Sequence, residues 1–167
     1  MKLSIITLLM TVLATGFMTG IFFTWTNAVM PGIGKLSDLE FLKALQSMNR
    51  VILNPLFYIS FIAPMVLFAM SLFFNYTLSS NSIFRLLLTA AIIYLLGVFF
   101  ITVLGNIPLN NLLDQSQLEM LNLEELQSLR TQIEVPWNQF NLIRTLSSFS
   151  SFVFLLITTF LLYQSDF

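Results

Sequence analysis

The chain has 167 residues, of which 57% are hydrophobic and 9% are charged, and its net charge is −1. Soluble domains carry about 25% charged residues, so this composition indicates an integral membrane protein embedded in the lipid bilayer. A chain without net positive charge lacks the concentrated basic surface that nucleic acid requires, which excludes nucleic acid as a partner. The chain contains no Cys and no His. Disulfides, thiolate chemistry, and haem or zinc sites built on His are therefore excluded as well.

The first apolar run begins after Lys2 and is long enough to cross a membrane. It exceeds the apolar region of a signal peptide, which has about 7–15 residues. We therefore expect a first membrane-spanning helix over residues 3–29, ended by Met30-Pro31-Gly32 because Pro removes a backbone donor. Gly16 and Gly20 form a pair of small residues four positions apart, a motif of close helix packing. The same pair is a candidate contact for a homo-oligomer.

The next elements are an amphipathic helix and a hairpin of two spans. Ser37 and Glu40 have the spacing of a capping box, in which a hydroxyl and a carboxylate satisfy the first amides of a helix. This spacing predicts a helix over 38–53, outside or just within the membrane interface. A second span is expected over 55–76 and, after a short turn, a third over 83–104.

The segment before the last span holds most of the acidic residues. Asn122 and Glu125 have capping-box spacing and predict a second amphipathic helix over 123–133, packed on the bundle as a lid. Trp137 then precedes a fourth span over 141–163. The sequence therefore predicts one all-α transmembrane domain over residues 1–167, an antiparallel four-helix bundle with two amphipathic loop helices on one face.

Polar side chains gather at one end of every predicted span, the end opposite both termini. They are Asn27, Gln46, Asn49, Arg50, Asn54, Asn106, Asn110, Asn111, Asn138, Asn141 and Arg144. In an antiparallel bundle these residues converge in one layer at the mouth. Polar groups near hydrocarbon are costly without partners, so this layer is the candidate site. The alternative is that it only locks the helices together, at roughly 0.6 kcal/mol for each hydrogen bond between membrane helices.

Arg144 is the strongest candidate within this layer. It lies near the N-terminus of its span, where a cation opposes the helix dipole, and Trp137 and Asn141 lie on the same face. Extension of its side chain to the headgroups is the alternative explanation. Arg50 is a weaker candidate because it lies near the C-terminus of its helix, where a cation is already favourable. Trp25 and Trp137 both fit an aromatic belt at the membrane interface.

Four segments, in order along nearly the whole chain, resemble a known family. They are Gly20-Ile-Phe-Phe with Val29-Met30-Pro31, Gln46-Ser-Met-Asn49-Arg50 with Asn54-Pro55-Leu-Phe57, Asn106-Ile-Pro108-Leu-Asn110-Asn111, and Trp137 with Asn141 and Arg144. With these segments the chain resembles the small four-span membrane family that includes the anthrone oxygenases, most of whose bacterial members are uncharacterised. The resemblance implies a location in the bacterial inner (plasma) membrane.

The resemblance also implies an activity, the oxidation of a polycyclic phenolic anthrone to an anthraquinone by O₂ without a metal or flavin cofactor. Arg144, Arg50 and Asn141 would then be the catalytic residues, as donors to a developing oxyanion. The predicted ligand-binding residues are Asn27, Gln46, Asn49, Asn54, Asn106, Asn110, Asn111 and Trp137. None of the matching segments contains a carboxylate that would act as the general base.

Two functions therefore remain open. The first is a cofactor-independent oxygenase acting on a hydrophobic aromatic or quinone-like molecule. The second is a non-catalytic membrane protein that binds a lipid, a quinone or a partner protein through the same polar mouth. Because Arg85 lies on the face that holds the termini, the positive-inside rule favours cytoplasmic termini.

Overall fold

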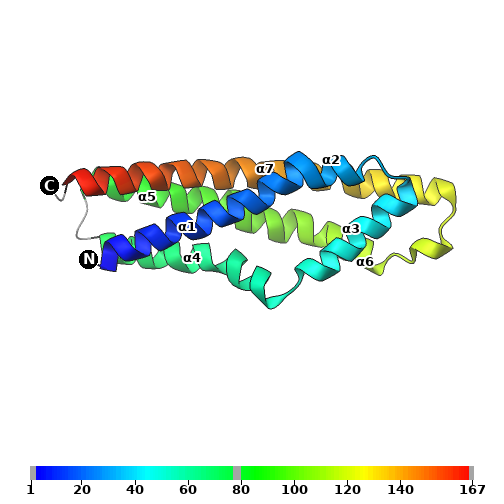
Figure 1. Ribbon diagram of the computed structural model, residues 1–167, viewed down its shortest axis with the longest axis horizontal. Coiled ribbons are helices and arrows are strands. Elements are labelled where there is room, and N and C mark those ends of the chain that lie inside the picture. The colour runs from blue at the N-terminus through cyan, green and yellow to red at the C-terminus, as the bar shows by residue number, and fades with distance from the viewer. Residues whose placement is uncertain (1–2, 77–79, 166–167) are drawn as a thin grey trace.

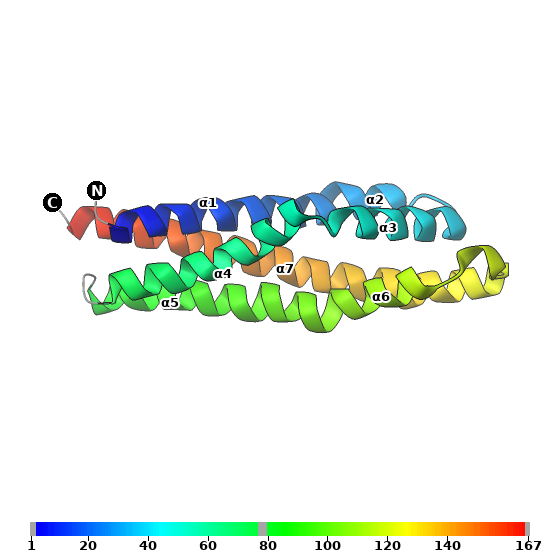
Figure 2. The same cartoon turned by 90° about the horizontal axis from the view of Figure 1, so that it is seen from below.

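The computed structural model describes residues 3–76 and 80–165, and four long helical segments in it form an elongated bundle (Figure 1). Helix α1 (Leu3–Thr24) packs against α4 (Pro55–Asn75) and α7 (Leu123–Ser165), and α5 (Asn81–Tyr94) packs against α7 and α4. The first and last described residues lie at the same end (Figure 2). The predicted all-α antiparallel membrane bundle is confirmed. Residues 77–79 of the predicted turn lie outside the described residues.

The bundle divides into two halves along its length. Helix α4 is about 31 Å long at 1.5 Å per residue, which matches the ~30 Å hydrocarbon thickness of a bilayer. The other three apolar segments, Leu3–Ile33, Ser82–Gln115 and Leu123–Gln164, are longer. Their excess extends beyond the same end, beside α3 (Asp38–Ile52) (Figure 2). We call residues 3–29, 55–76, 80–106 and 141–165 the membrane half, and residues 30–54 and 107–140 the projecting half.

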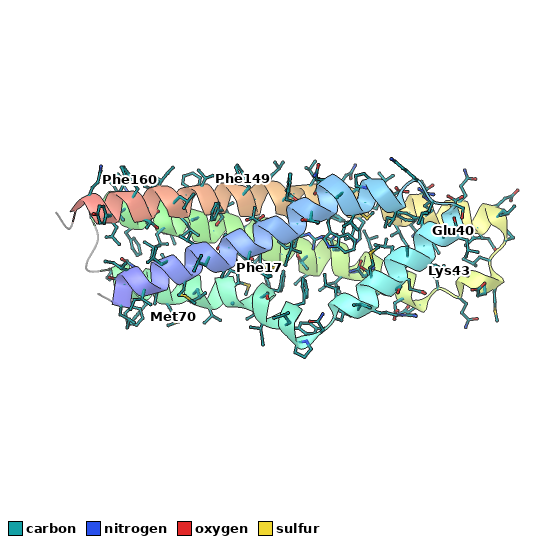
Figure 3. The ribbon with its side chains drawn as sticks, in the orientation of Figure 1. Phe17, Glu40, Lys43, Met70, Phe149 and Phe160 are labelled. Atoms are coloured by element: carbon teal, nitrogen blue, oxygen red, sulfur yellow. The ribbon has the colours of Figure 1, made fainter. Side chains whose placement is uncertain are left out.

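The surfaces of the two halves differ as a membrane boundary requires. In the membrane half, large apolar side chains such as Phe17, Phe149 and Phe160 are exposed around the bundle (Figure 3). A soluble protein rarely exposes so continuous an apolar surface, whereas a bilayer covers it. Glu40 and Lys43 lie on the projecting half instead. The chain is therefore an integral membrane protein with one half in the bilayer and one half beyond it.

Each half has its own apolar core. The core of the membrane half is built from α1, α4, α5 and α7, and its buried members include Leu8, Met18, Phe68, Tyr94 and Leu155. The core of the projecting half joins α3 to α6 (Ile107–Gln115) and α7, with Phe41, Leu42, Leu113 and Ile133 fully buried. A layer of buried polar side chains separates the two cores.

A helix capping box and the side chain of Arg130 hold the start of α3 in place in the projecting half. The predicted capping box is present, since Ser37 Oγ accepts from the Glu40 amide and Glu40 Oε2 accepts from the Ser37 amide at 3.2 Å. The hydrogen bonds from the Ser37 hydroxyl and amide hold the pKa of Glu40 below its usual value. Arg130 of α7 pairs with Asp38 at 2.9 Å and donates to the Gly34 carbonyl at 2.7 Å. These contacts fix the start of α3 against α7.

The expectation that Met30-Pro31-Gly32 ends the first helix is wrong, and so is the expected end of the third helix near residue 104. In both places the helix widens into a π-turn before the Pro and then continues. Trp25–Val29 precedes α2 (Met30–Ile33), and Thr102–Asn106 precedes α6. In each, the residue before the Pro donates to the carbonyl five positions earlier, from Met30 to Trp25 and from Ile107 to Thr102. The wider turn carries the helix past a ring that would clash with a regular α-helical carbonyl.

The separate helices expected over 123–133 and 141–163 form one helix, α7, which runs from Leu123 to Ser165 through Pro136. A Pro inside a helix costs about 3 kcal/mol or more. Ile133 and Trp137, on either side of it, are both buried in the core of the projecting half. Burial of a large apolar side chain contributes about 1.5–3 kcal/mol, so these two contacts offset the missing backbone hydrogen bond.

Candidate functional site

The polar layer lies at the level where the membrane half meets the projecting half. Arg144 is about 32 Å before the end of α7 at Ser165, close to one full hydrocarbon thickness. Its side chain is nevertheless buried, with 6% of its surface exposed, so it does not extend to the headgroups. We call Thr102, Asn106, Asn141 and Arg144 the Arg144 layer; all four are buried.

Arg144 has polar and aromatic partners but no counter-ion. Its Nη2 donates to Asn141 Oδ1 at 2.8 Å, and its Nη1 donates to Thr102 Oγ1 at 3.4 Å. The Nε has no hydrogen-bond partner. The guanidinium lies over the rings of Phe22 and Trp137, at 4.7 and 5.5 Å from their centroids. Among the residues that the structure describes, no carboxylate lies within ion-pair distance of Arg144. A buried cation without an anion is costly, so the arrangement favours an anionic ligand.

Asn141 holds Arg144 in place from behind. Its Nδ2 donates to Thr26 Oγ1 at 2.7 Å and to the Phe22 carbonyl at 3.1 Å, which leaves Oδ1 directed to Arg144. The Thr26 and Thr145 hydroxyls lie 2.9 Å apart. This chain of hydrogen bonds connects the π-turn at Trp25–Val29 to α7.

Asn106, in the π-turn at Thr102–Asn106, presents an unused acceptor. It is 1% exposed, and its Nδ2 donates to the Trp137 carbonyl at 3.4 Å. Its Oδ1 has no hydrogen-bond partner. Because most buried side-chain polar atoms are hydrogen-bonded, an orphan of this kind calls for an explanation. A hydroxyl group on a bound molecule would supply the missing donor.

Asn110 hydrogen-bonds to side chains of two other elements, Trp137 of α7 and Asn49 of α3. Its Oδ1 accepts from Trp137 Nε1 at 2.9 Å and from Asn49 Nδ2 at 3.1 Å. The ring of Trp25 lies 5.1 Å from the ring of Trp137, at an interplanar angle of 48°. One edge of the site is therefore a pair of indoles, of which Trp137 is held by the Asn110 amide oxygen and Trp25 packs against Trp137.

These groups surround a cavity of about 120 Å³. Its lining comprises Ile21, Phe22, Trp25, Asn49, Ile52, Leu53, Phe57, Tyr58, Phe61, Thr102, Asn106, Ile107, Asn110, Trp137 and Arg144. Leu53 and Tyr58 are 61% and 50% exposed and stand where α3 meets α4, the elbow at which the chain turns away from the bundle (Figure 1). The cavity therefore reaches the surface at this elbow, beside the start of the membrane-spanning helix α4.

The lining of the cavity suits a small range of ligand groups. Aromatic and aliphatic walls suit a flat apolar ring, the guanidinium suits a negative oxygen, and Asn106 Oδ1 suits a hydroxyl. No carboxylate lines the cavity, so the lining supplies no general base. Over residues 3–76 and 80–165, no group of three acidic side chains lies close enough to hold a metal ion.

The structure places the predicted residues in two groups. Asn49, Asn106, Asn110, Trp137 and Arg144 line the cavity, and Asn141 lies directly behind it. The other predicted residues, Asn27, Gln46, Arg50, Asn54 and Asn111, do not line it.

Each of these outlying residues has a different environment. Gln46 ties α3 to α6 by donating to the Leu113 carbonyl at 2.8 Å, and Asn54 caps α4 by accepting from the Phe57 amide at 3.0 Å. Arg50 forms an exposed ion pair with Asp114 at 2.5 Å. Asn27 and Asn111 are exposed.

Sequence reasoning missed Trp25, Phe22 and Thr102 as parts of the site. Trp25 fitted an aromatic belt, and Thr102 looked like an ordinary hydroxyl residue within a span. The sequence does contain a signal for Trp25 and Thr102, because each lies six residues before a Pro, Pro31 and Pro108 respectively. These two residues open the π-turns Trp25–Val29 and Thr102–Asn106, and π-turns occur frequently at functional sites. The third π-helical segment among the described residues, Leu95–Phe100, is not followed by a Pro in this way.

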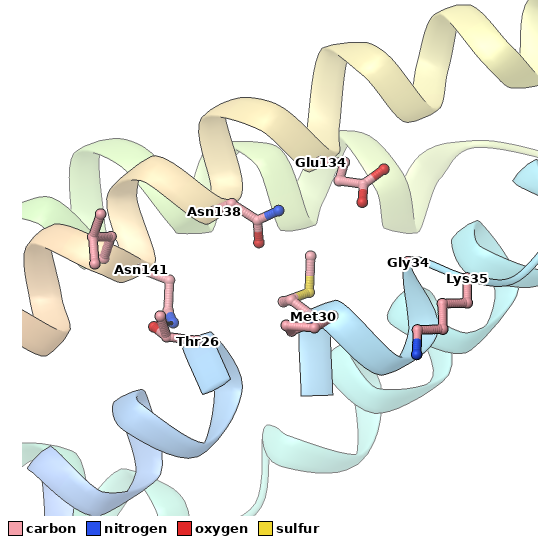
Figure 4. Close-up of a pocket in the computed structure, with 9 residues that line it drawn as sticks. Thr26, Met30, Gly34, Lys35, Glu134, Asn138 and Asn141 are labelled. Carbon is pink, nitrogen blue, oxygen red and sulfur yellow. Dashed lines mark hydrogen bonds between the residues drawn. The ribbon is translucent and has the colours of Figure 1, made fainter. Parts of the chain in front are cut away.

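A second, more polar pocket of about 400 Å³ lies on the other side of Asn141, between α2 and α7 (Figure 4). Thr26 and Asn141 form its end towards the membrane half. Glu134 and Asn138 project into it from α7, and Lys35 follows α2. Asn141 therefore separates an apolar cavity from a polar one.

Comparison with known proteins identifies one family. No curated protein and no solved structure matches the chain. The family model described as anthrone oxygenase matches residues 55–154, more than half of the chain. The matched region contains all of the Arg144 layer together with Asn110 and Trp137. The chain therefore belongs to the anthrone oxygenase family.

Proposed function

We propose that the cavity binds a planar aromatic molecule as its oxygen anion, and that the protein oxidises an anthrone to an anthraquinone with O₂. One observation carries the proposal: Arg144 is buried among aromatic rings, and no described residue supplies a counter-ion. An anthrone that has lost its C10 proton places negative charge on its C9 oxygen. That oxygen is the anion which the guanidinium lacks, and one ring of the molecule lies against the aromatic lining of the cavity.

The reaction needs only the anion and O₂. Loss of the C10 proton gives a delocalised carbanion, which passes one electron to O₂ to form superoxide and a delocalised C10-centred radical. These two combine to make the C10–O bond of a peroxide anion, which takes up one proton from solvent to become a hydroperoxide. Loss of the remaining C10 hydrogen as a proton, with cleavage of the O–O bond, then gives the C10 carbonyl and water. One anthrone and one O₂ yield one anthraquinone and one H₂O.

Arg144 acts in the first step by stabilising the anion. A preorganised donor in a water-excluded site contributes about 10²–10³ in rate. Thr102 and Asn141 orient the guanidinium, and Asn106 Oδ1 accepts from a ring hydroxyl. Because no carboxylate among the described residues lines the cavity, we assign the C10 proton to solvent and not to a side chain.

The cavity volume restricts how the substrate lies. Sites for small molecules commonly have about 300–1,000 Å³, and an apolar cavity of about 150 Å³ holds benzene. A cavity of about 120 Å³ therefore accepts roughly one ring. The other rings of an anthrone extend past Leu53 and Tyr58 towards the bilayer, from which an apolar substrate arrives.

A second function is favoured by the lack of a base among the lining residues. In this alternative the protein binds a quinone or a lipid-soluble phenol through the same contacts and performs no chemistry. The catalytic proposal requires O₂ consumption above the spontaneous rate, whereas the binding proposal requires only occupancy.

The experiment measures both quantities on one sample. Purified protein in lipid nanodiscs is mixed with a hydroxyanthrone, and O₂ uptake and anthraquinone absorbance are followed against empty nanodiscs. Occupancy is read from tryptophan fluorescence, because the protein has two Trp residues and both line the cavity. Quenching together with excess O₂ uptake supports the oxygenase. Quenching without excess O₂ uptake supports the non-catalytic binding protein. If neither quenching nor excess uptake is seen, both functions are rejected.

A further inference from the structure

A groove runs between α1 and α7 on the outside of the membrane half. Its apolar part has a volume of about 590 Å³ and is lined by Gly20, Phe23, Leu146, Phe149 and Phe152, among others. The two glycines of α1 differ in this groove. A Cβ at Gly16 would lie 2.9 Å from the Phe152 ring, whereas a Cβ at Gly20 would meet nothing within 4 Å. Gly16 therefore serves packing within the chain, and Gly20 leaves space on the outside.

The apolar part has the depth of one leaflet. From Gly16 to Thr26 the helix rises about 15 Å at 1.5 Å per residue. The hydrocarbon of one leaflet is half of ~30 Å. Thr26 lies at the level of the Arg144 layer, where the hydrocarbon ends. A single acyl chain of the adjoining leaflet therefore matches the groove in length.

The groove continues into the polar pocket of Figure 4. The two pockets share Thr26 and Leu142. Beyond this junction the lining changes to Lys35, Glu134 and Asn138. Figure 4 shows the Lys35 side chain extending back along α2 towards the end that holds Thr26. The lining thus changes from apolar to charged at the depth where a lipid changes from acyl chain to headgroup.

The charged part offers one positive and one negative contact. Lys35 is exposed and supplies an ammonium group. Glu134 uses Oε2 to pair with Arg130 Nε at 2.6 Å, while its Oε1 faces Gly34, where an added Cβ would lie 3.3 Å away. Oε1 accepts no hydrogen bond from the residues that the structure describes. A headgroup with both a phosphate and an ammonium complements this pair.

We propose that the α1–α7 groove binds a phospholipid whose headgroup carries a phosphate and a primary ammonium. The acyl chain lies against Gly20, the phosphate contacts Lys35 and Asn138, and the ammonium donates to Glu134 Oε1. A quaternary ammonium has no N–H to donate, and a headgroup without an amine leaves Glu134 opposite a phosphate.

The test is lipid retention. Protein is extracted from nanodiscs that contain equal amounts of phosphatidylethanolamine, phosphatidylcholine and phosphatidylglycerol, and bound lipid is counted by native mass spectrometry. We expect phosphatidylethanolamine to be retained about tenfold over phosphatidylcholine, the effect of one charge-assisted hydrogen bond. Glu134→Gln should abolish that preference. Gly20→Leu should lower retention of all three lipids, since it fills the groove without a clash inside the chain.

Matched variants keep the test decisive. Glu124→Gln changes an exposed carboxylate at the start of α7, and Val66→Phe adds bulk to an exposed position on α4; neither should alter retention. If Glu134→Gln melts at a lower temperature because Arg130 is disturbed, Lys35→Gln tests the phosphate contact at an exposed residue. Equal retention of the three lipids, a preference for phosphatidylglycerol, or dimers that disappear in Gly20→Leu would each overturn the proposal.

Discussion

Two buried polar clusters lie inside this bundle, and they differ in whether their hydrogen bonds are complete. The α1–α4 polar cluster (Thr7, Thr11, Ser71 and Asn75) lies near the terminal end of the membrane half. The Thr11 and Ser71 hydroxyls are 2.8 Å apart, and Asn75 Nδ2 donates to the Ser71 carbonyl at 2.8 Å. The Arg144 layer at the other end leaves Asn106 Oδ1 and Arg144 Nε without partners.

This difference separates a helix contact from a binding site. A complete network joins two helices and needs no further molecule, as hydrogen bonds between membrane helices commonly do. In an incomplete network that includes a cation, the free energy of desolvating the polar groups is not offset by hydrogen bonds. A ligand that supplies the missing hydrogen-bonding groups offsets this free energy and therefore binds favourably. We therefore assign the α1–α4 polar cluster to folding and propose binding for the Arg144 layer, and the two assignments predict opposite responses to mutation.

The largest effect is expected from Arg144→Met. Removing the guanidinium should lower excess O₂ uptake with a hydroxyanthrone about 100-fold. The free energy of unfolding should stay within about 1 kcal/mol or rise, because a buried charge without a counter-ion is lost. Uptake is measured with an oxygen electrode, and stability by denaturation in mild detergent. A large fall in stability together with activity would instead make Arg144 a structural residue.

Arg50→Met is the matched control for that variant. Arg50 carries the same charge but forms an exposed ion pair with Asp114, and such pairs contribute about 0–1 kcal/mol. Activity and tryptophan quenching should therefore remain at the wild-type level. A loss similar to that of Arg144→Met would mean that Arg50 acts in the site after all.

Asn106→Leu should have the next largest effect. Its Oδ1 is a buried acceptor without a donor, and its Nδ2 makes one long bond of 3.4 Å to the Trp137 carbonyl. Removal of this amide should therefore lower the free energy of unfolding of the free protein by no more than about 1 kcal/mol. Affinity for a hydroxylated ring should fall about tenfold, the value of one hydrogen bond to a group that the ligand alone satisfies. The measurement is a fluorescence titration with a hydroxyanthraquinone and with its analogue that lacks the hydroxyl. If both ligands weaken equally, Asn106 does not read the hydroxyl.

The sequence predicts this fold well because the length of an apolar run and the spacing of a capping box are local properties. The amphipathic helix α3 and all four crossings follow from them, whereas 123–133 is helical but is not a separate helix. The helix ends near Pro31, Pro108 and Pro136 could not be predicted this way. At each of them, tertiary packing or a π-turn overrides the local preference of Pro, and neither is visible in a window of a few residues.

The sequence predicts the depth of the site along the bundle, but not the direction in which each side chain points around its helix. The ends of the spans place Asn27, Asn106, Asn111 and Arg144 at one depth. However, each π-turn adds one residue to a turn, which rotates the following side chains by roughly 100°. Among the described residues, Asn106 and Asn110 line the cavity, whereas Asn111 and Asn27 are exposed. Periodicity that assumes a regular α-helix cannot supply this information.

The smallest effect is expected in the α1–α4 polar cluster. Ser71→Ala removes the hydroxyl that meets Thr11, so the free energy of unfolding should fall by roughly 0.6 kcal/mol, the average for hydrogen bonds between membrane helices. Thr11→Ala should cost about the same, and the double variant little more than either, because both remove one shared bond. Ligand affinity and O₂ uptake should not change in any of the three. A change in either quantity would show that the two polar clusters are coupled through α1, and the division between a folding contact and a binding site would then fail.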